Sequence, residues 1–211
     1  ILKSAKKPLV IAGGGVRYSE AGETLQNFCE KHNIPFAETQ SGKSSVLSSH
    51  KLNVGGVGVT GNLSANLIAK DADVIIGVGT RFSDFTTASK SLFKDDAKFI
   101  TINTDRFDAY KLSATKAVCD AKLGINALDI EIGDYKTEYT TEIDDAKKAW
   151  DEEMVRLSEY KYTEDFEPII KARYEDTIPE FVEKTGGTIT QTAALALIRK
   201  TIVDDAIAVA A

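Results

Sequence analysis

The sequence predicts an α/β fold in which a parallel sheet of about six strands carries helices on both faces. Short apolar runs that can be buried on both sides alternate with stretches whose apolar residues recur at helical spacing. Two of the apolar runs end directly on glycines, as a buried strand does where it enters a tight turn. Strands that alternate with helices imply βαβ units with right-handed crossovers, so the predicted arrangement is Rossmann-like.

The elements follow from these patterns in chain order. The predicted strands cover residues 7–12, 34–37, 73–78, 98–103 and 116–119. Ser19 is a plausible cap for a helix that ends at Asn33, Asn62 can cap a second helix, and residues 121–130 form a third. The polar segment 38–56 is expected to be a long loop with at most a short helix.

A change of composition divides the chain into three parts. Residues 1–133 form the Rossmann-like domain. Residues 134–187 begin with a charged, helix-prone stretch and continue as a polar linker broken by Pro168 and Pro179. Residues 188–211 give a capped helix and a strand at 206–210, which we interpret as the start of another domain.

Composition excludes several classes of protein. The apolar share is 43%, and no run approaches the roughly 18 consecutive apolar residues that a membrane span needs. The formal net charge is −6, and no basic stripe interleaved with aromatics appears, which argues against a nucleic-acid partner. Cys29 and Cys119 lie far apart, which predicts small buried residues rather than a disulfide or metal site. No signal-like segment precedes the first strand, which predicts a cytoplasmic protein.

Side chains suited to catalysis are few. His32 falls on a predicted helix face and His50 in a loop, with no nucleophile motif beside either, so we expect structural roles. Gly13, Gly14 and Gly15 follow the first strand, where backbone amides can approach a phosphate. A dinucleotide fingerprint would also need glycine at Tyr18, and Glu38 ends the second strand, where a carboxylate can hold a ribose. The sequence predicts no catalytic residue and no metal ligand.

One cluster follows the strand at 73–78. Arg81 and Asp84 come after its carboxyl end, the edge at which open α/β sheets bind ligands. The pair either binds a ligand or pins the loop, and both readings stay open. We expect this segment and the glycine-rich loop 55–61 to form one groove.

Four motifs in order resemble the central domain of the thiamine-diphosphate enzymes, the family that contains acetolactate synthase and pyruvate oxidase. They are KPLVIAGGGV at 7–16, VGVTG at 57–61, ADVIIGVGTRFSDF at 72–85 and ITINTD at 100–105. The resemblance covers residues 1–132, and 188–211 is similar to the opening of the family's diphosphate-binding domain. The motifs look most like the branch that opens a cyclic dione in bacterial inositol catabolism. Acetolactate synthases more typically have a histidine in the VGVTG motif and Asp-Arg in place of Asp84-Phe85.

The resemblance implies a full-length enzyme that uses thiamine diphosphate and Mg²⁺, held by domains outside this chain, so the fragment alone is predicted to be inactive. Its partners would be those other domains, in a homodimer or homotetramer. The residues that the resemblance makes candidates for cofactor binding are Gly13, Gly14, Gly15, Gly58, Gly61, Gly79, Thr80, Arg81, Asn103 and Asp120. Thr101 and Asn103 stand where flavin-binding relatives have aspartates, which argues against FAD. The alternatives are acetolactate synthase or a related thiamine-diphosphate enzyme, and a structural module that binds FAD or ADP.

Overall fold

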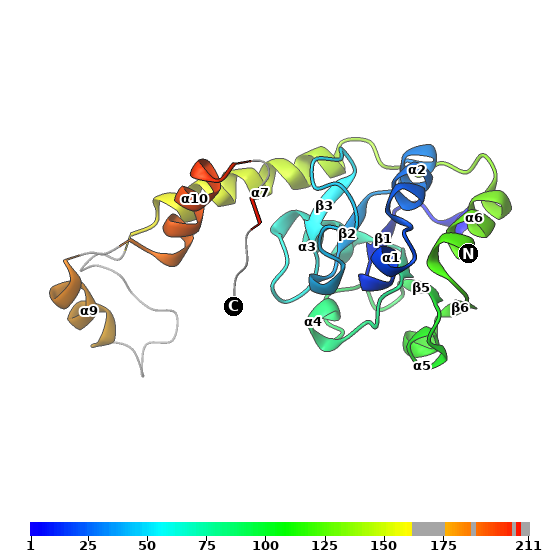
Figure 1. Ribbon diagram of the computed structural model, residues 1–211, viewed down its shortest axis with the longest axis horizontal. Helices are drawn as coiled ribbons and strands as arrows, with labels where there is room; N and C mark the ends of the chain where they lie inside the picture. Colours follow the sequence, from blue (N-terminus) through cyan, green and yellow to red (C-terminus); the bar gives the residue numbers. More distant parts are fainter. Residues whose placement is uncertain (162–175, 187–188, 204–205, 208–211) are drawn as a thin grey trace. The chain divides into compact units, whose positions relative to one another are not determined.

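The computed structural model describes residues 1–161, 176–186, 189–203 and 206–207 (Figure 1). It divides into two compact units, residues 1–150 and 151–211. The boundaries expected near 133 and 187 stay predictions. The strand expected at 206–210 lies largely outside the described residues.

The first unit is built on a six-stranded sheet in which every pairing is parallel, as predicted. The strands are β1 (Pro8–Ala12), β2 (Phe36–Glu38), β3 (Asn53–Gly56), β4 (Val74–Val78), β5 (Lys98–Asn103) and β6 (Thr115–Val118). Their order is β3-β2-β1-β4-β5-β6, so the order reverses between β1 and β4. Every residue of β1 and β4 is buried, which explains why these strands are continuous apolar runs.

Helices lie between the strands and follow the last of them (Figure 1). They are α1 (Gly14–Tyr18), α2 (Gly22–His32), α3 (Leu63–Asp71), α4 (Asp84–Thr87), α5 (Arg106–Ala109), α6 (Ala121–Ile132) and α7 (Glu142–Glu159), with single turns η1 (Leu2–Ser4), η2 (Gln40–Gly42) and η3 (Lys111–Ser113). α2 and α6 pack side by side on one face, where His32 Nε2 of α2 lies 2.7 Å from Asp129 Oδ1 of α6. Because the chain moves from β1 to β2 in one direction and from β3 to β4 in the other, the right-handed rule for such crossovers puts α3 on the opposite face from α2.

Several local predictions differ from the structure: β2 begins at Phe36 instead of residue 34, and Asn62 precedes α3 without a capping hydrogen bond from its side chain. The expected loop at 38–56 contains β3, whose sequence NVGG has too few apolar residues to be read as a strand. Ser19 does not cap α2: it ends the short helix α1, and α2 begins at Gly22. β6 lies one residue earlier than expected. None of these changes the predicted topology.

The second unit contains α9 (Thr177–Thr185) and α10 (Gln191–Thr201). Thr190 caps α10, since its hydroxyl accepts a hydrogen bond from Ala193 N at 3.2 Å. α9 lies within the segment that was expected to be a polar linker, so that segment includes a helix. Pro179 is compatible with α9 because it lies in the first turn, where a backbone donor is not needed.

Candidate functional site

Two glycine loops meet at the carboxyl edge of the sheet because β1 and β4 are neighbours. Gly13 N donates to Val78 O at 2.9 Å, and Gly15 N donates to Gly79 O at 3.0 Å. A Cβ at Gly13 would lie 2.3 Å from Gly79 O, and one at Gly15 would lie 2.7 Å from Gly79 Cα. The backbones thus touch directly, and only glycine fits between them.

This contact gives Gly13 and Gly15 a structural reason that the sequence did not reveal. Their two amides already donate to the end of β4, so those two are not directed at an incoming phosphate. Whether Gly13, Gly14 and Gly15 bind a nucleotide stays a prediction.

The loop from Gly55 to Gly61 is held by two asparagine side chains. Asn66 brackets Gly58, accepting from its N at 3.0 Å and donating to its O at 2.9 Å. Asn62 Oδ1 accepts from Gly56 N at 3.2 Å. Gly58 has φ of +108°, and a Cβ there would lie 2.1 Å from Phe85 O, so this loop lies directly against α4.

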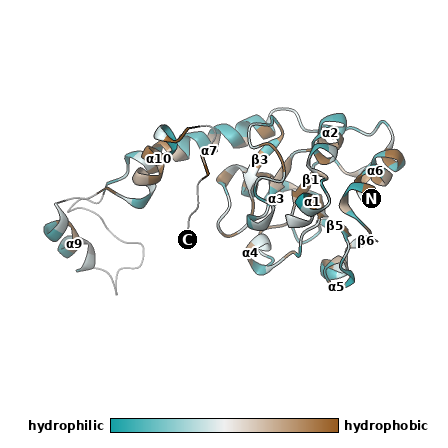
Figure 2. Ribbon diagram, viewed as in Figure 1, coloured by the Kyte–Doolittle hydropathy of each residue, from teal (hydrophilic) through white to brown (hydrophobic). Residues whose placement is uncertain are grey.

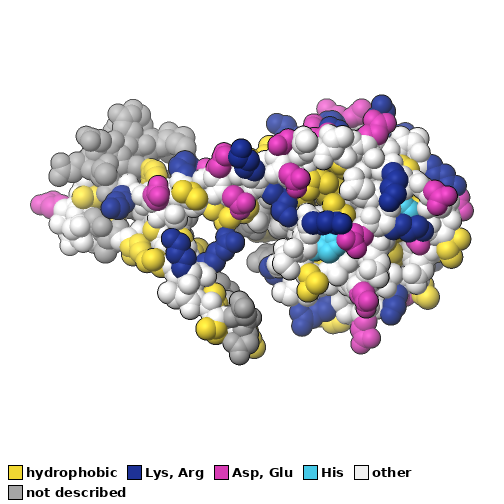
Figure 3. Space-filling view, turned by 90° about the horizontal axis from the view of Figure 1, so that it is seen from above, with side chains coloured by type: hydrophobic (Ala, Val, Ile, Leu, Met, Phe, Trp, Pro, Cys, Tyr) yellow, Lys and Arg dark blue, Asp and Glu magenta, His cyan; other side chains and the backbone are white. Residues whose placement is uncertain are grey.

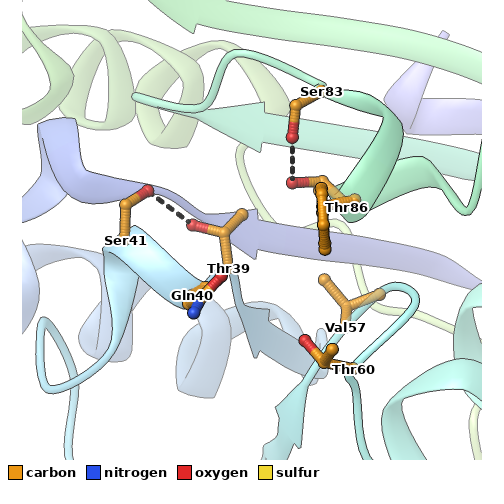
Figure 4. Close-up of a pocket in the computed structure, with 8 residues that line it drawn as sticks. Thr39, Gln40, Ser41, Val57, Thr60, Ser83 and Thr86 are labelled. Atoms are coloured by element: carbon orange, nitrogen blue, oxygen red, sulfur yellow. Dashed lines mark hydrogen bonds between the residues drawn. The ribbon is translucent and has the colours of Figure 1, made fainter. Parts of the chain in front are cut away.

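A polar crevice of about 330 Å³ opens beside these loops (Figure 4). Its lining comes from the end of β2, the glycine-rich loop and the start of α4: Thr39, Gln40, Ser41, Val57, Thr60, Ser83, Phe85 and Thr86. Thr39 and Ser41 hydroxyls lie 3.2 Å apart, and Ser83 and Thr86 hydroxyls lie 3.3 Å apart. Of the two segments expected to form one groove, 55–61 contributes Val57 and Thr60 to this crevice and 79–84 contributes Ser83.

The crevice is lined by uncharged side chains. It spans the point at which the strand order reverses, the usual ligand position in open α/β sheets. Hydroxyl and amide groups suit a small neutral polar molecule, whereas a diphosphate needs cations or free amides. None of the ten residues predicted to bind a cofactor is among those that line it, although Gly58, Gly61 and Arg81 are close in sequence to lining residues.

Arg81, predicted as an anion ligand, lies instead beside α5. Its side chain is 83% exposed, and its Nε is 3.7 Å from Asp108 Oδ2. The same carboxylate accepts from Lys111 Nζ at 2.6 Å, and Lys111 Nζ also donates to the Arg81 carbonyl at 3.0 Å. Asp84 does not pair with Arg81 but starts α4. The expected Arg81-Asp84 pair is therefore not formed, and Lys111 fastens this loop instead, through the Arg81 carbonyl and Asp108. Whether Arg81 binds an anion stays a prediction.

Glu38 is a residue whose role the sequence reading missed. Its side chain is 1% exposed, and its carboxylate accepts from Ser44 N at 2.8 Å and Lys43 Nζ at 3.2 Å. Asn53 Nδ2 of β3 also donates to it, at 3.4 Å. The carboxylate that was a candidate ribose ligand therefore joins β2, β3 and the loop between them.

The two residues that stand where flavin-binding relatives have aspartates are engaged internally. Thr101 Oγ1 donates to Ala109 O at 2.7 Å. Asn103 Nδ2 donates to Thr80 O at 3.0 Å, and its Oδ1 accepts from Asp105 N at 3.0 Å. Both side chains fasten the turns after β4 and β5.

Asp120 caps α6. Its Oδ1 accepts from Lys122 N at 2.9 Å and Leu123 N at 3.2 Å. A hydrogen bond with the Ser19 side chain, followed by the bond from Leu123 N, lowers the pKa of this carboxyl. These contacts show that Asp120 caps the N-terminus of α6.

The histidines have structural roles, as predicted. His32 is fully buried, with Nδ1 2.8 Å from Tyr135 O and Nε2 on Asp129, so it joins α2, α6 and the segment after α6. His50 Nδ1 accepts from Leu52 N at 3.1 Å. Cys29 is buried, which raises the pKa of its thiol well above the usual value, whereas Cys119 is only partly buried. The prediction that both cysteines are buried is therefore confirmed for Cys29 alone.

Among the residues that the structure describes, no group of three or more His, Cys, Asp and Glu side chains is positioned to hold a metal ion. On the face seen in Figure 3, Lys and Arg are intermixed with Asp and Glu instead of forming the continuous basic surface typical of nucleic-acid binding. In the same described part of the chain, no helix combines the length and apolar character needed to cross a membrane.

Comparison with known proteins agrees with this geometry. Residues 1–128 match the family model described as thiamine pyrophosphate enzyme, central domain. The chain belongs to this family.

Several similar proteins carry one name. A 3D-(3,5/4)-trihydroxycyclohexane-1,2-dione hydrolase of Clostridium perfringens is 59% identical over 214 residues, which cover all of this chain and 34% of the relative. Hydrolases of that name from Geobacillus thermodenitrificans and Bacillus thuringiensis are 53% and 48% identical, each over the whole chain and 33% of the relative. The chain thus spans about a third of the length of the relatives that it matches.

Proposed function

We propose that this chain is the central, non-catalytic part of a thiamine-diphosphate-dependent hydrolase that opens the ring of 3D-(3,5/4)-trihydroxycyclohexane-1,2-dione. The observation that carries the proposal is the identity of 48–59% over the whole chain to enzymes of that name. Such identity extends through the second unit, beyond the residues that the family model matches.

The geometry supports a positioning role for this part of the enzyme. Both histidines, Glu38 and Asp120 are engaged in holding secondary structure together. Residues outside this chain would hold thiamine diphosphate and Mg²⁺. No catalytic step is assigned to the residues described here.

We further propose that the carboxyl-edge crevice holds no dinucleotide. Three observations support this. The amides of Gly13 and Gly15 already donate hydrogen bonds to the end of β4, and the side chains that line the crevice are uncharged. Thr101 and Asn103 are hydrogen-bonded to backbone carbonyls of the chain itself. A structural FAD or ADP module is the competing function, and acetolactate synthase is the competing activity. Homodimeric or homotetrameric assembly and a cytoplasmic location belong to the same proposal.

The test uses the full-length protein supplied with thiamine diphosphate and Mg²⁺. Ring opening of the dione, without formation of acetolactate from pyruvate, is the expected result. The 211-residue chain alone is expected to show no turnover and no thiamine diphosphate binding in a calorimetric titration. Acetolactate formation by the full-length protein, or micromolar thiamine diphosphate binding by the chain alone, would overturn the proposal.

A further inference from the structure

The polar crevice at the carboxyl edge of the sheet carries two pairs of hydroxyl groups. Thr39 and Ser41, which follow β2, form one pair. Ser83 and Thr86, at the start of α4, form the other, and Figure 4 shows the two pairs apart, on different sides of the crevice. A hydroxyl group has one donor and two acceptor sites, so each pair can also bond a ligand. Figure 2 shows hydrophobic residues in brown along β1, so the crevice is a polar edge on an apolar core.

Two further polar groups of the crevice are not engaged by the protein. The side-chain amide of Gln40 and the hydroxyl of Thr60 belong to exposed residues that line it. Neither group makes a hydrogen bond to another residue in the part of the chain that the structure describes. They differ in this from Glu38, Thr101 and Asn103, whose side chains hold the fold together. A ligand can therefore bond Gln40 and Thr60 without breaking a contact within the protein.

The crevice also has an apolar side. Val57 is buried and Phe85 is 62% exposed, and both line it. An aromatic ring exposed to this extent is a large apolar surface that gains free energy when a ligand covers it. Val59 N donates to Phe85 O at 2.9 Å, so the glycine-rich loop and α4 are already fixed against each other. A fixed apolar surface beside a few polar groups is the usual composition of a small-molecule site.

The substrate in the relatives' name has the matching chemistry. 3D-(3,5/4)-trihydroxycyclohexane-1,2-dione is an uncharged six-membered ring with three hydroxyl and two carbonyl groups. Its hydroxyl groups can bond the hydroxyl and amide groups of the crevice, while its C–H groups cover Val57 and Phe85. None of the described lining side chains is charged. Burial of a neutral ring there leaves no charge unpaired, whereas a carboxylate or a diphosphate would be buried without a cation.

We propose that the crevice binds the hydroxylated ring of the dione, and that Gln40 and Thr60 determine specificity by bonding its hydroxyl groups. The inference rests on the proposed function, because the ring is the substrate proposed there. These residues bind the ring and take no part in bond cleavage. A nucleotide is the competing ligand, but the nearby Lys43 is already held by Glu38 and Ser48.

Steady-state kinetics of the full-length protein, supplied with thiamine diphosphate and Mg²⁺, test the assignment. Thr60→Val removes the hydroxyl and keeps the shape of the side chain, and Gln40→Ala removes the amide. Each is expected to raise KM for the dione about 2- to 12-fold, the effect of one lost hydrogen bond, with kcat unchanged. Thr60→Ser keeps the hydroxyl and should keep the wild-type KM. Thr115→Val makes the same change at an exposed position of β6 that does not line the crevice, and it should leave KM unchanged.

Three analogues of the dione, each lacking one ring hydroxyl, separate recognition from an effect on the fold. The wild type is expected to use at least one of them with a lower kcat/KM than the dione, and Thr60→Val should reduce that difference. A structural role of Thr60 would lower kcat/KM for all the compounds alike and would overturn the inference. Wild-type KM values in both Thr60→Val and Gln40→Ala would also overturn it, while ring opening by the wild type keeps the proposed function. No ring opening by the wild type would overturn both.

Discussion

Replacing Gly13 with alanine would force a methyl group against the end of β4. The new Cβ would lie 2.3 Å from Gly79 O and 2.6 Å from Thr80 Cα, so one backbone must move by about 1 Å to restore ordinary contact. Gly13 has φ of −97°, which alanine adopts freely, so the cost is steric alone. We expect Gly13→Ala to lower the free energy of unfolding by about 1–3 kcal/mol, the usual range for overpacking.

Gly14→Ala is the matched control in the same loop. The nearest atom to its Cβ is Ser41 O at 3.2 Å, which requires a shift of only a few tenths of an ångström. Gly14 also starts α1, where alanine is the better helix former. We expect its free energy of unfolding to stay within about 1 kcal/mol of the wild-type value.

Urea unfolding of both variants, followed by far-UV circular dichroism without added ligand, measures the difference. In thermal scans, each 1 kcal/mol corresponds to a shift in Tm of about 2–4 °C for a chain of this size. If the glycines serve only to admit a phosphate, both variants unfold like the wild type. Equal midpoints for Gly13→Ala and wild type, or a larger loss for Gly14→Ala, would refute the packing explanation.

Three further predictions concern charge and cofactor content. The hydrogen bond and ion pair from Lys7 lower the pKa of Glu142 to about 2, so this carboxylate stabilises the fold above about pH 4.5 and progressively less as pH falls toward 2. Glu142→Gln should therefore lower the urea midpoint at pH 6, and its midpoint should fall less between pH 4.5 and 2.5 than the wild-type midpoint does. The same pH dependence of the midpoint in both proteins would contradict this. Arg81→Ala should change the free energy of unfolding by less than about 0.5 kcal/mol, because the ion pair of Arg81 with Asp108 is long and exposed. Lys111→Ala should lower the free energy of unfolding more, because the ion pair of Lys111 with Asp108 is shorter and less exposed. A larger loss for Arg81→Ala in urea unfolding would contradict the conclusion that Lys111 is the main partner of Asp108. The purified chain should lack flavin absorbance, and a yellow preparation would show that the crevice still binds FAD.

The sequence predicted the sheet well because the deciding signal is hydrophobic burial. All residues of β1 and β4 are apolar and buried, so their sequence pattern predicts a buried strand without an alternative. β3 has no such signal: Asn53–Gly56 is a strand because its backbone pairs with β2 and its Asn53 side chain reaches the buried Glu38. Such long-range pairing leaves little trace in a four-residue sequence.

The sequence alone leaves the site open because several of its residues have a second physical use. Glycines after a strand can admit a phosphate or another backbone, and only the register of β1 against β4 shows that Gly79 occupies the space at Gly13. Glu38 at a strand end can hold a ribose or bind a neighbouring loop, and the choice depends on Ser44 and Asn53. Spacing along the chain carries no information about either contact.

The two edges of the sheet have a consequence for how the molecule behaves in concentrated solution. β3 and β6 have only four residues each, β3 ends in two glycines with a shifted register against β2, and β6 carries Lys116. Short, irregular or charged edges are poor templates for a strand from another molecule. Self-association through continued sheets is therefore disfavoured at both ends, and the domain can be joined to the rest of a large enzyme through its faces without exposing a surface that seeds fibres.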